Sequence, residues 1–365
     1  MFSRYSIIAP LAAAALAIGA LASPALVVAD ELTASDGIVL LNAPGDGAGL
    51  LGGESLKGSN QASVSQQTPS LTTGLVLIDT EINYGQAAAA GTGMVLTAGG
   101  IVITNHHVVA GSTSISVTDP STGNQYQADV LGYDTTDDVA VLQLEGATNM
   151  ATVTMSTQVG KVGDAITAVG NAEGQGQLVE ATGRILGTDV SITVSEEDGS
   201  GQANLTGLFQ TTAALVPGDS GGAMFDNSSK VVAMNVAGST SQRNPEGYGI
   251  PVVTVLKVAN AVLTGQANST ITLGRTAALG ISILSTQAAG APQIIEVIPG
   301  AAADQAGIRV GSTLTSLDGI TLTSPDQIKP ILATHQPGDK VQATWTDRSG
   351  RQHTATVTLG VAPLA

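Results

Sequence analysis

Hydrophobic residues along most of this chain occur in short runs, each bounded by glycine, asparagine, aspartate or serine. Short runs rich in Val and Ile are typical of β-strands rather than of helices. Their close spacing predicts a mainly β fold, built as a sandwich or as a pair of barrels. The clearest runs are 74–78, 93–96, 114–117, 139–142 and 230–234.

Two stretches depart from this strand pattern. Pro251 opens a helix-like stretch that ends near Gly265, because proline is favoured in the first turn of a helix and glycine just past its end. A second helix is predicted after Ser324, which forms a capping box with Gln327. Pro330 lies inside that helix and is predicted to kink or shorten it.

The order of these segments predicts five regions. Residues 1–29 combine a basic residue, an apolar run and small terminal residues, which indicates an export signal peptide, with a membrane anchor as the alternative. Residues 30–73 are polar and predict a flexible low-complexity leader. Two folded blocks, 74–265 and 276–361, are joined by a polar linker at 266–275. We therefore expect the folded part outside the cytoplasm, either secreted or associated with the cell envelope.

Composition narrows the classes of function. The 365 residues include 13 Lys and Arg against 29 Asp and Glu, a net charge of −16. Phosphate backbones would repel such a chain, so we expect no nucleic-acid partner. The absence of cysteine excludes disulfides and thiol catalysis. Neighbouring residues of a strand point to opposite faces, so His106 and His107 are not expected to share a metal, and we predict no metal and no cofactor.

Ser220 stands among glycines, in Pro217-Gly218-Asp219-Ser220-Gly221-Gly222. A serine hydroxyl becomes a nucleophile only when a base takes its proton and a third group orients that base. The pair His106-His107 follows a predicted strand, and Asp138 directly precedes another. Each has a structural explanation when taken alone: a hairpin serine, a surface histidine pair, a turn carboxylate. Together, in the chain order His, Asp, Ser of chymotrypsin-like enzymes, they predict a catalytic triad.

The glycines beside Ser220 have a predicted use as well. Gly218 allows its N–H to turn toward a substrate carbonyl, and the N–H of Ser220 is the second donor. We therefore expect the turn Gly218, Asp219 and Ser220 to form an oxyanion hole.

Three motifs in this order resemble those of HtrA-family serine proteases. They are the histidine region 104–111, the run Asp138-Val139-Ala140-Val141-Leu142 and the serine motif 217–222. The resemblance covers about residues 74–361 and is greatest to secreted PepA-like members. It implies a chymotrypsin/trypsin-like double β-barrel with the site between the barrels. It also identifies His107 as the base, because the family's base directly precedes the Val-Val pair.

The resemblance further implies a serine endopeptidase with the triad His107, Asp138 and Ser220, which acts on unfolded or misfolded proteins. A homotrimer is a possible assembly by the same resemblance. Asp219 stands where many members have Asn, and Thr212 replaces an Asp that is frequent in the family. No Ile-Val-Gly-Gly-like start is present for Asp219 to pair with. The alternative is therefore a catalytically weak chaperone or a peptide-binding protein of the same fold.

Specificity is predicted from two segments. A pocket that selects Lys or Arg would have a carboxylate about six residues before the serine, where this chain has Ala214. An apolar pocket predicts cleavage after small or medium aliphatic residues. The segment Asn235, Val236, Ala237 and Gly238 is predicted to be an edge strand that pairs with the substrate backbone.

Residues 278–283 and 297–308 resemble a PDZ domain of the HtrA type, which implies a small α+β domain. Leu279, Gly280 and Ile281 are expected to present backbone N–H groups to the carboxylate of a C-terminal peptide. Gly280 fits this role because a side chain there would crowd the ligand. The alternative is a packing module that only docks on the protease.

Overall fold

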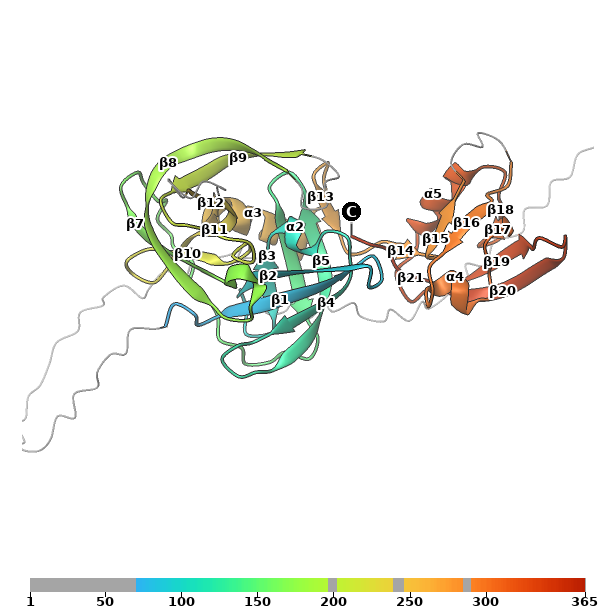
Figure 1. The fold of residues 1–365 in the computed structure, drawn as a ribbon, viewed down its shortest axis with the longest axis horizontal. Helices are drawn as coiled ribbons and strands as arrows, with labels where there is room; N and C mark the ends of the chain where they lie inside the picture. The colour runs from blue at the N-terminus through green and yellow to red at the C-terminus, as the bar shows by residue number, and fades with distance from the viewer. Residues whose placement is uncertain (1–69, 196–201, 239–245, 285–289, 365) are drawn as a thin grey trace, which may run out of the picture. The chain divides into compact units, whose positions relative to one another are not determined.

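This computed structural model describes residues 70–195, 202–238, 246–284 and 290–364 (Figure 1). The predicted signal peptide, 1–29, and most of the predicted leader, 30–73, lie outside these ranges. Within them, no helix is both long and apolar enough to cross a membrane.

The first barrel is a ring of six antiparallel strands. Its order is β5-β4-β1-β2-β3-β6, and a further pairing between β5 and β6 closes the ring. Val and Ile side chains such as Val76, Ile78 and Val117 fill its interior. The short helix α2 (His106–Val109) connects β3 to β4. The strands are β1 (Leu75–Ile82), β2 (Ala87–Val95), β3 (Ile101–Thr104), β4 (Ser112–Thr118), β5 (Gln125–Asp134) and β6 (Val139–Leu144).

The second barrel is also closed, in the order β10-β11-β12-β9-β8-β7 (Figure 1). A 3₁₀ turn, η1 (Ala172–Gly174), connects β7 to β8, and helix α3 (Val252–Leu263) follows β12. Pro251 caps α3 and Gly265 follows its end with a φ of +70°, as predicted. The strands are β7 (Ala165–Gly170), β8 (Val179–Ser195), β9 (Gln202–Thr211), β10 (Ala223–Phe225), β11 (Val231–Gly238) and β12 (Gly247–Pro251).

The last block is a small α+β domain around a core that contains Trp345, the single tryptophan. The capping box of Ser324 and Gln327 is present and starts η2 (Pro325–Gln327). Pro330 lies in α5 (Ile328–Leu332), which has five residues, so the helix is short as predicted. The remaining elements are β14 (Ala277–Ala278), β15 (Ile281–Ile283), β16 (Ile294–Val297), α4 (Ala302–Gln305), β17 (Thr313–Leu317), β18 (Ile320–Thr321), β19 (Lys340–Thr346), β20 (Gln352–Thr358) and β21 (Gly360–Val361).

The five hydrophobic runs all fall on strands, and the predicted mainly β class is confirmed. The choice left open between a sandwich and barrels resolves to two closed barrels. The polar segment 266–275 differs from a free linker, because it contains β13 (Ile271–Leu273), which pairs with β5 at Gly132–Asp134. Thr270 Oγ1 also donates to Asp134 Oδ2 at 2.6 Å. Three residues, of which only Ile271 is buried, are too short a run to be predicted as a strand.

Candidate active site

His107 and Asp138 are held together by two hydrogen bonds. His107 Nδ1 lies 2.7 Å from Asp138 Oδ2, and the His107 N–H donates to Asp138 Oδ1 at 2.9 Å. Asp138 is buried, while the His107 side chain is 42% exposed. A buried carboxylate bonded to Nδ1 fixes the orientation of the imidazole ring.

The main chain around Asp138 is shaped for this contact. Asp138 has a φ of +52°, an uncommon value for a residue with a side chain. Its carbonyl accepts from the Asn105 side-chain amide at 2.9 Å and from the His106 N–H at 3.3 Å. His106 instead stacks on the ring of Tyr133, 4.8 Å between centroids. The Asp138 carboxylate is thus bonded to His107, while the His106 ring packs on Tyr133.

Ser220 directly follows a tight turn in which close neighbouring atoms leave room only for glycine. Residues 216–219 form a turn closed by the Asp219 N–H to Val216 carbonyl bond at 3.1 Å, with Pro217 second and Gly218 third. Gly218 has a φ of +91°, as expected for the third position of a type II turn. A Cβ on Gly218 would lie 2.1 Å from the Asn171 carbonyl oxygen. No other residue fits here without moving the main chain.

The peptide between Pro217 and Gly218 is oriented by a bond to η1. The Pro217 carbonyl accepts from the Glu173 N–H at 2.7 Å. In a trans peptide the C=O and the following N–H point in opposite directions, so the Gly218 N–H points away from Glu173. The bond to η1 thus fixes the direction of the Gly218 N–H, which the sequence predicted as an oxyanion-hole donor.

Thr92 of β2 connects this turn to the first barrel. Its hydroxyl donates to the Gly218 carbonyl at 2.8 Å and accepts from the Asn171 N–H at 2.8 Å. Its N–H donates to the Ser220 carbonyl at 2.9 Å, and its own carbonyl accepts from Thr104 Oγ1 at 2.7 Å. Thr92 is fully buried. One residue of the first barrel, through its hydroxyl and its N–H, is thus bonded to both Gly218 and Ser220 of the second.

Asn235 supports the same turn from β11. Its side-chain amide donates to the carbonyls of Val169 and Asp219 at 3.1 and 3.3 Å. Its N–H and carbonyl are bonded to Gly222 and Gly221. Asn235 is fully buried and its main chain is bonded within the protein, so its described contacts support the serine turn, and its predicted contact with substrate stays a prediction.

The prediction that residues 235–238 form an edge strand is corrected in part. β11 is an interior strand of the closed barrel, between β10 and β12. Its pairing with β10 ends at Met234, while its pairing with β12 continues to Gly238. Only the main chain of Val236, Ala237 and Gly238 therefore extends past β10. The Val236 carbonyl accepts from Ser220 Oγ at 3.2 Å.

Residues 212–216, which precede the serine motif, include no carboxylate. Ala214 is exposed, and its neighbours Ala213 and Leu215 are buried in the core of the second barrel. Thr212, the departure noted in the sequence, has a structural partner: its hydroxyl accepts from the Arg184 N–H at 3.0 Å. It ties the segment to β8.

The segment predicted as the carboxylate loop of the last domain, Leu279 to Ile281, packs closely against its neighbours. Leu279 is buried, and Ile281 starts β15, which pairs with β16. Gly280 has a φ of +70°, and a Cβ on it would lie 2.3 Å from Ala301 Cβ. The fold alone thus already requires a glycine at this position.

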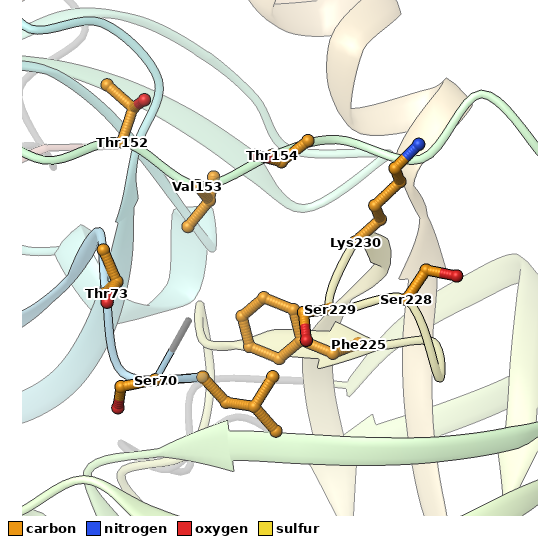
Figure 2. Close-up of a pocket in the computed structure, with 10 residues that line it drawn as sticks. Ser70, Thr73, Thr152, Val153, Thr154, Phe225, Ser228, Ser229 and Lys230 are labelled. Carbon is orange, nitrogen blue, oxygen red and sulfur yellow. The ribbon is translucent and has the colours of Figure 1, made fainter. Parts of the chain in front are cut away.

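A separate cavity of about 220 Å³ is not part of this site. Figure 2 shows the Phe225 ring between the segments 70–73 and 152–154. None of the three predicted catalytic side chains lines the cavity. Across the described residues, no three His, Asp or Glu side chains gather closely enough to hold a metal ion.

A role for Thr92, which stands in the motif Gly91-Thr92-Gly93, was not predicted from the sequence. A threonine flanked by two glycines inside a strand is a weak signal. The structure gives its context: a Cβ on Gly91 would lie 2.6 Å from Val108 of α2. The glycine lets α2 approach the strand, and the threonine beside it bonds the serine turn.

Asp219 generates a prediction on stability. Its Oδ2 accepts from the Val216 N–H at 2.9 Å, while its Oδ1 is buried with no hydrogen-bond partner among the described atoms. Burial raises the pKa of Asp219 to about 6, although the hydrogen bond from the Val216 N–H acts to lower that pKa. The folded state therefore holds this proton more tightly than the unfolded state, and stability falls as pH rises from about 4 through 6. Asp219→Asn should raise the Tm by on the order of 3 °C at pH 7.5, and this gain should shrink at pH 4.5.

Melting curves of the wild type and of Asp219→Asn at pH 4.5 and 7.5 measure this difference in Tm. Asp189→Asn is the matched control, because Asp189 is an exposed carboxylate in β8 and should show no change at either pH. An equal gain for Asp219→Asn at pH 4.5 and 7.5 would mean that the buried charge is not its cause.

Comparison with known proteins agrees with this geometry. Residues 91–234 match the family described as trypsin-like peptidase domain, and residues 293–341 match the PDZ domain family. Serine protease PepD of Mycobacterium tuberculosis is 28% identical over 322 residues, which cover 82% of this chain and 66% of PepD. Serine protease Do-like HtrA of Lactococcus lactis is 30% identical over 297 residues, which cover 75% of this chain and 71% of that protein.

This chain thus spans just under two thirds of the length of PepD. A solved structure of the serine endoprotease from Yersinia pestis aligns with a TM-score of 0.45 at 22% identity, over 80% of this chain and 94% of that chain. The relatives, the two family matches and the arrangement of barrels lead to one assignment. The chain belongs to the HtrA family of serine proteases.

Proposed function

We propose that this chain is an exported endopeptidase that hydrolyses unfolded or misfolded proteins, with His107, Asp138 and Ser220 as its triad. The observation that supports this best is that two hydrogen bonds join His107 to Asp138 on the first barrel. The serine turn is bonded to the same barrel through Thr92. A binding protein without turnover would not need either feature.

In the proposed reaction, His107 takes the proton of Ser220 Oγ as Oγ attacks the scissile carbonyl carbon. The carbonyl π electrons move to its oxygen, and the N–H groups of Gly218 and Ser220 stabilise that oxyanion. His107 then gives its proton to the leaving amine, which departs and leaves an acyl-enzyme. Water, deprotonated by His107, hydrolyses the ester and restores Ser220. Asp138 orients the imidazole and stabilises its charged form.

The bond between Ser220 Oγ and the Val236 carbonyl suggests how substrate starts this reaction. A hydroxyl has one proton, so it cannot donate to Val236 and to an imidazole at once. An extended substrate that pairs with residues 236–238 would offer its own N–H to the Val236 carbonyl. Ser220 Oγ would then be released to turn toward His107. The substrate backbone is therefore proposed to help activate the nucleophile.

The side chain before the cleaved bond is proposed to be small or medium and apolar. Ala214 is short and uncharged, and buried apolar residues flank it. This supports an apolar pocket, because a selective site for Lys or Arg needs a carboxylate.

The PDZ domain is proposed to bind peptide C-termini. Among the described residues, β15 pairs with β16 alone, so one edge remains for an added strand. The carbonyls of Leu279 and Gly280 are bonded to the N–H groups of Ala303 and Ile298. This fixes the loop that would hold the carboxylate. The homotrimer and export from the cytoplasm stay predictions from the sequence.

Replacing the nucleophile gives the first test of this function. Ser220→Ala should lower kcat on unfolded casein by on the order of 10⁶, as triad removal does in serine proteases. Mass spectrometry of the wild-type digest should find cuts after Ala, Val, Ile or Leu.

A fluorophosphonate probe separates this proposal from the chaperone alternative. Ser220 of the folded wild-type protein should be labelled, and His107→Ala should prevent the labelling. Folded wild-type protein that binds unfolded casein but takes no label would favour the chaperone.

Thr92 gives a second test, through a hydroxyl that never touches substrate. Thr92→Val keeps the shape but removes the bonds to Gly218 and Asn171, so the oxyanion turn should loosen. We expect a loss of about 10²-fold or more in kcat, comparable to removing one oxyanion donor, with KM little changed. Thr92→Ser keeps the hydroxyl and should recover most of the rate. Equal losses in the two variants would show that packing, rather than the hydrogen bonds, is what matters.

Gly280 tests the PDZ loop. Gly280→Ala places a Cβ against Ala301 at a positive φ, so the loop must distort. Affinity for an apolar C-terminal peptide should fall at least tenfold, on the order of 1.4 kcal/mol, while cleavage of a short substrate without that terminus stays unchanged. Gly319→Ala is the control, because it has the same backbone strain with no atom near its Cβ. Similar peptide affinities for both variants would exclude this loop as the binding site.

A further inference from the structure

The segment that follows the PDZ strands returns to the first barrel. The Leu364 side chain is 6% exposed and belongs to the core of that barrel. The same core contains Val108 and Val109, which are half of helix α2. Leu364 is thus packed as a core residue of a barrel whose strands lie more than two hundred positions earlier in the chain.

The main chain of Leu364 is bonded to the residues that follow α2. Its N–H donates to the Ser112 carbonyl at 3.2 Å, and its carbonyl accepts from the Gly111 N–H at 2.8 Å. Arg275 reinforces the same point, because its guanidinium donates to the carbonyl and to the hydroxyl of Ser112, each at 3.0 Å. Ser112 is fully buried. Two segments on either side of the PDZ domain therefore meet at one residue.

These two segments are also joined to each other. β14 pairs with β21, and the Ala362 N–H donates to the Thr276 carbonyl at 2.9 Å. Pro363 has no N–H to donate. The N–H groups on either side of it donate in different directions: that of Ala362 to Thr276, directly after the linker, and that of Leu364 to Ser112 of the barrel. The Tyr84 hydroxyl adds a bond to the Val361 carbonyl. Val361, Ala362 and Leu364 are therefore each hydrogen-bonded to Thr276 or to the first barrel.

We propose that Leu364 is a positioning residue for His107. Its side chain fills the core that supports α2, and its main chain fixes Gly111 and Ser112 directly after that helix. The Ala110 N–H bonds back to the His106 carbonyl, so the fixed end is connected to the turn that contains the base. This rests on the proposed role of His107 in hydrolysis. Without Leu364, α2 should keep its contact with Asp138 less tightly.

Full-length Leu364→Ala tests this, with Leu273→Ala as the matched control. Both remove the same atoms, but Leu273 is 37% exposed whereas Leu364 is buried in the barrel. Leu364→Ala should lower the Tm by on the order of 5 °C or more, and Leu273→Ala should not. Leu364→Val, which leaves a smaller cavity, serves if the alanine variant fails to fold.

Hydrogen exchange gives a readout that does not depend on activity. In Leu364→Ala the peptide that covers residues 106–118 should exchange faster, and peptides from β7 and β8 should not change. For catalysis, kcat per fluorophosphonate-titrated site should fall about tenfold or more, since small misplacements of a catalytic group are costly, with KM within twofold. Leu364→Met should recover the rate, because it restores the buried volume.

The outcomes separate two failures. If the wild type hydrolyses nothing, the proposed function fails, while faster exchange at 106–118 still supports the docking of Leu364. If exchange at 106–118 is the same in the wild type, Leu364→Ala and Leu364→Val, the segment does not hold α2 and the inference is overturned. Faster exchange with an unchanged kcat per site overturns the positioning role as well.

Discussion

The hydrogen bonds of Thr92 to the serine turn are the contact on which this site depends. The first barrel contains His107 and Asp138, and the second contains Ser220, so neither barrel has all three residues of the proposed triad. Thr92 connects them through its N–H to Ser220 and its hydroxyl to Gly218 and Asn171. A fully buried hydroxyl that both donates and accepts has no freedom to turn. The turn that precedes Ser220 is therefore held in one conformation relative to the first barrel, which contains His107.

This arrangement has energetic costs that the surrounding contacts must offset. Asp138 has a positive φ, and Asp219 keeps a buried oxygen without a hydrogen-bond partner among the described atoms. Backbone strain and buried charge of this kind persist only where the neighbouring structure imposes them. Here the Glu173 and Asn235 bonds on one side and Thr92 on the other impose the turn. No pairing of Asp219 with a newly made N-terminus is needed to orient the Pro217–Gly218 peptide.

The sequence predicted the features that repeat or that have fixed chemistry. Runs such as 139–142 identified strands because β-branched residues recur there, and the order of His107, Asp138 and Ser220 indicated the class of site. The position of Thr92 was not predicted, because one hydroxyl bonding two distant loops leaves no pattern in the sequence. The support that Asn235 gives to the serine turn was not predicted for a related reason: its position on β11 was clear, but its burial depends on residues 219–222. Leu364 and β13 are short segments whose partners lie far away in the chain, and periodicity does not detect them.

A crystal structure of the full chain after reaction with a phosphonate tests the central claim most directly. The phosphorus should be bonded to Ser220 Oγ, with one phosphonyl oxygen within hydrogen-bond distance of the Gly218 and Ser220 N–H groups. The Thr92 bonds to Gly218 and Ser220 should be intact, and the Pro217 carbonyl should still accept from Glu173. A phosphonate bonded elsewhere, or a turn that has flipped and lost its bonds to Thr92, would contradict the account.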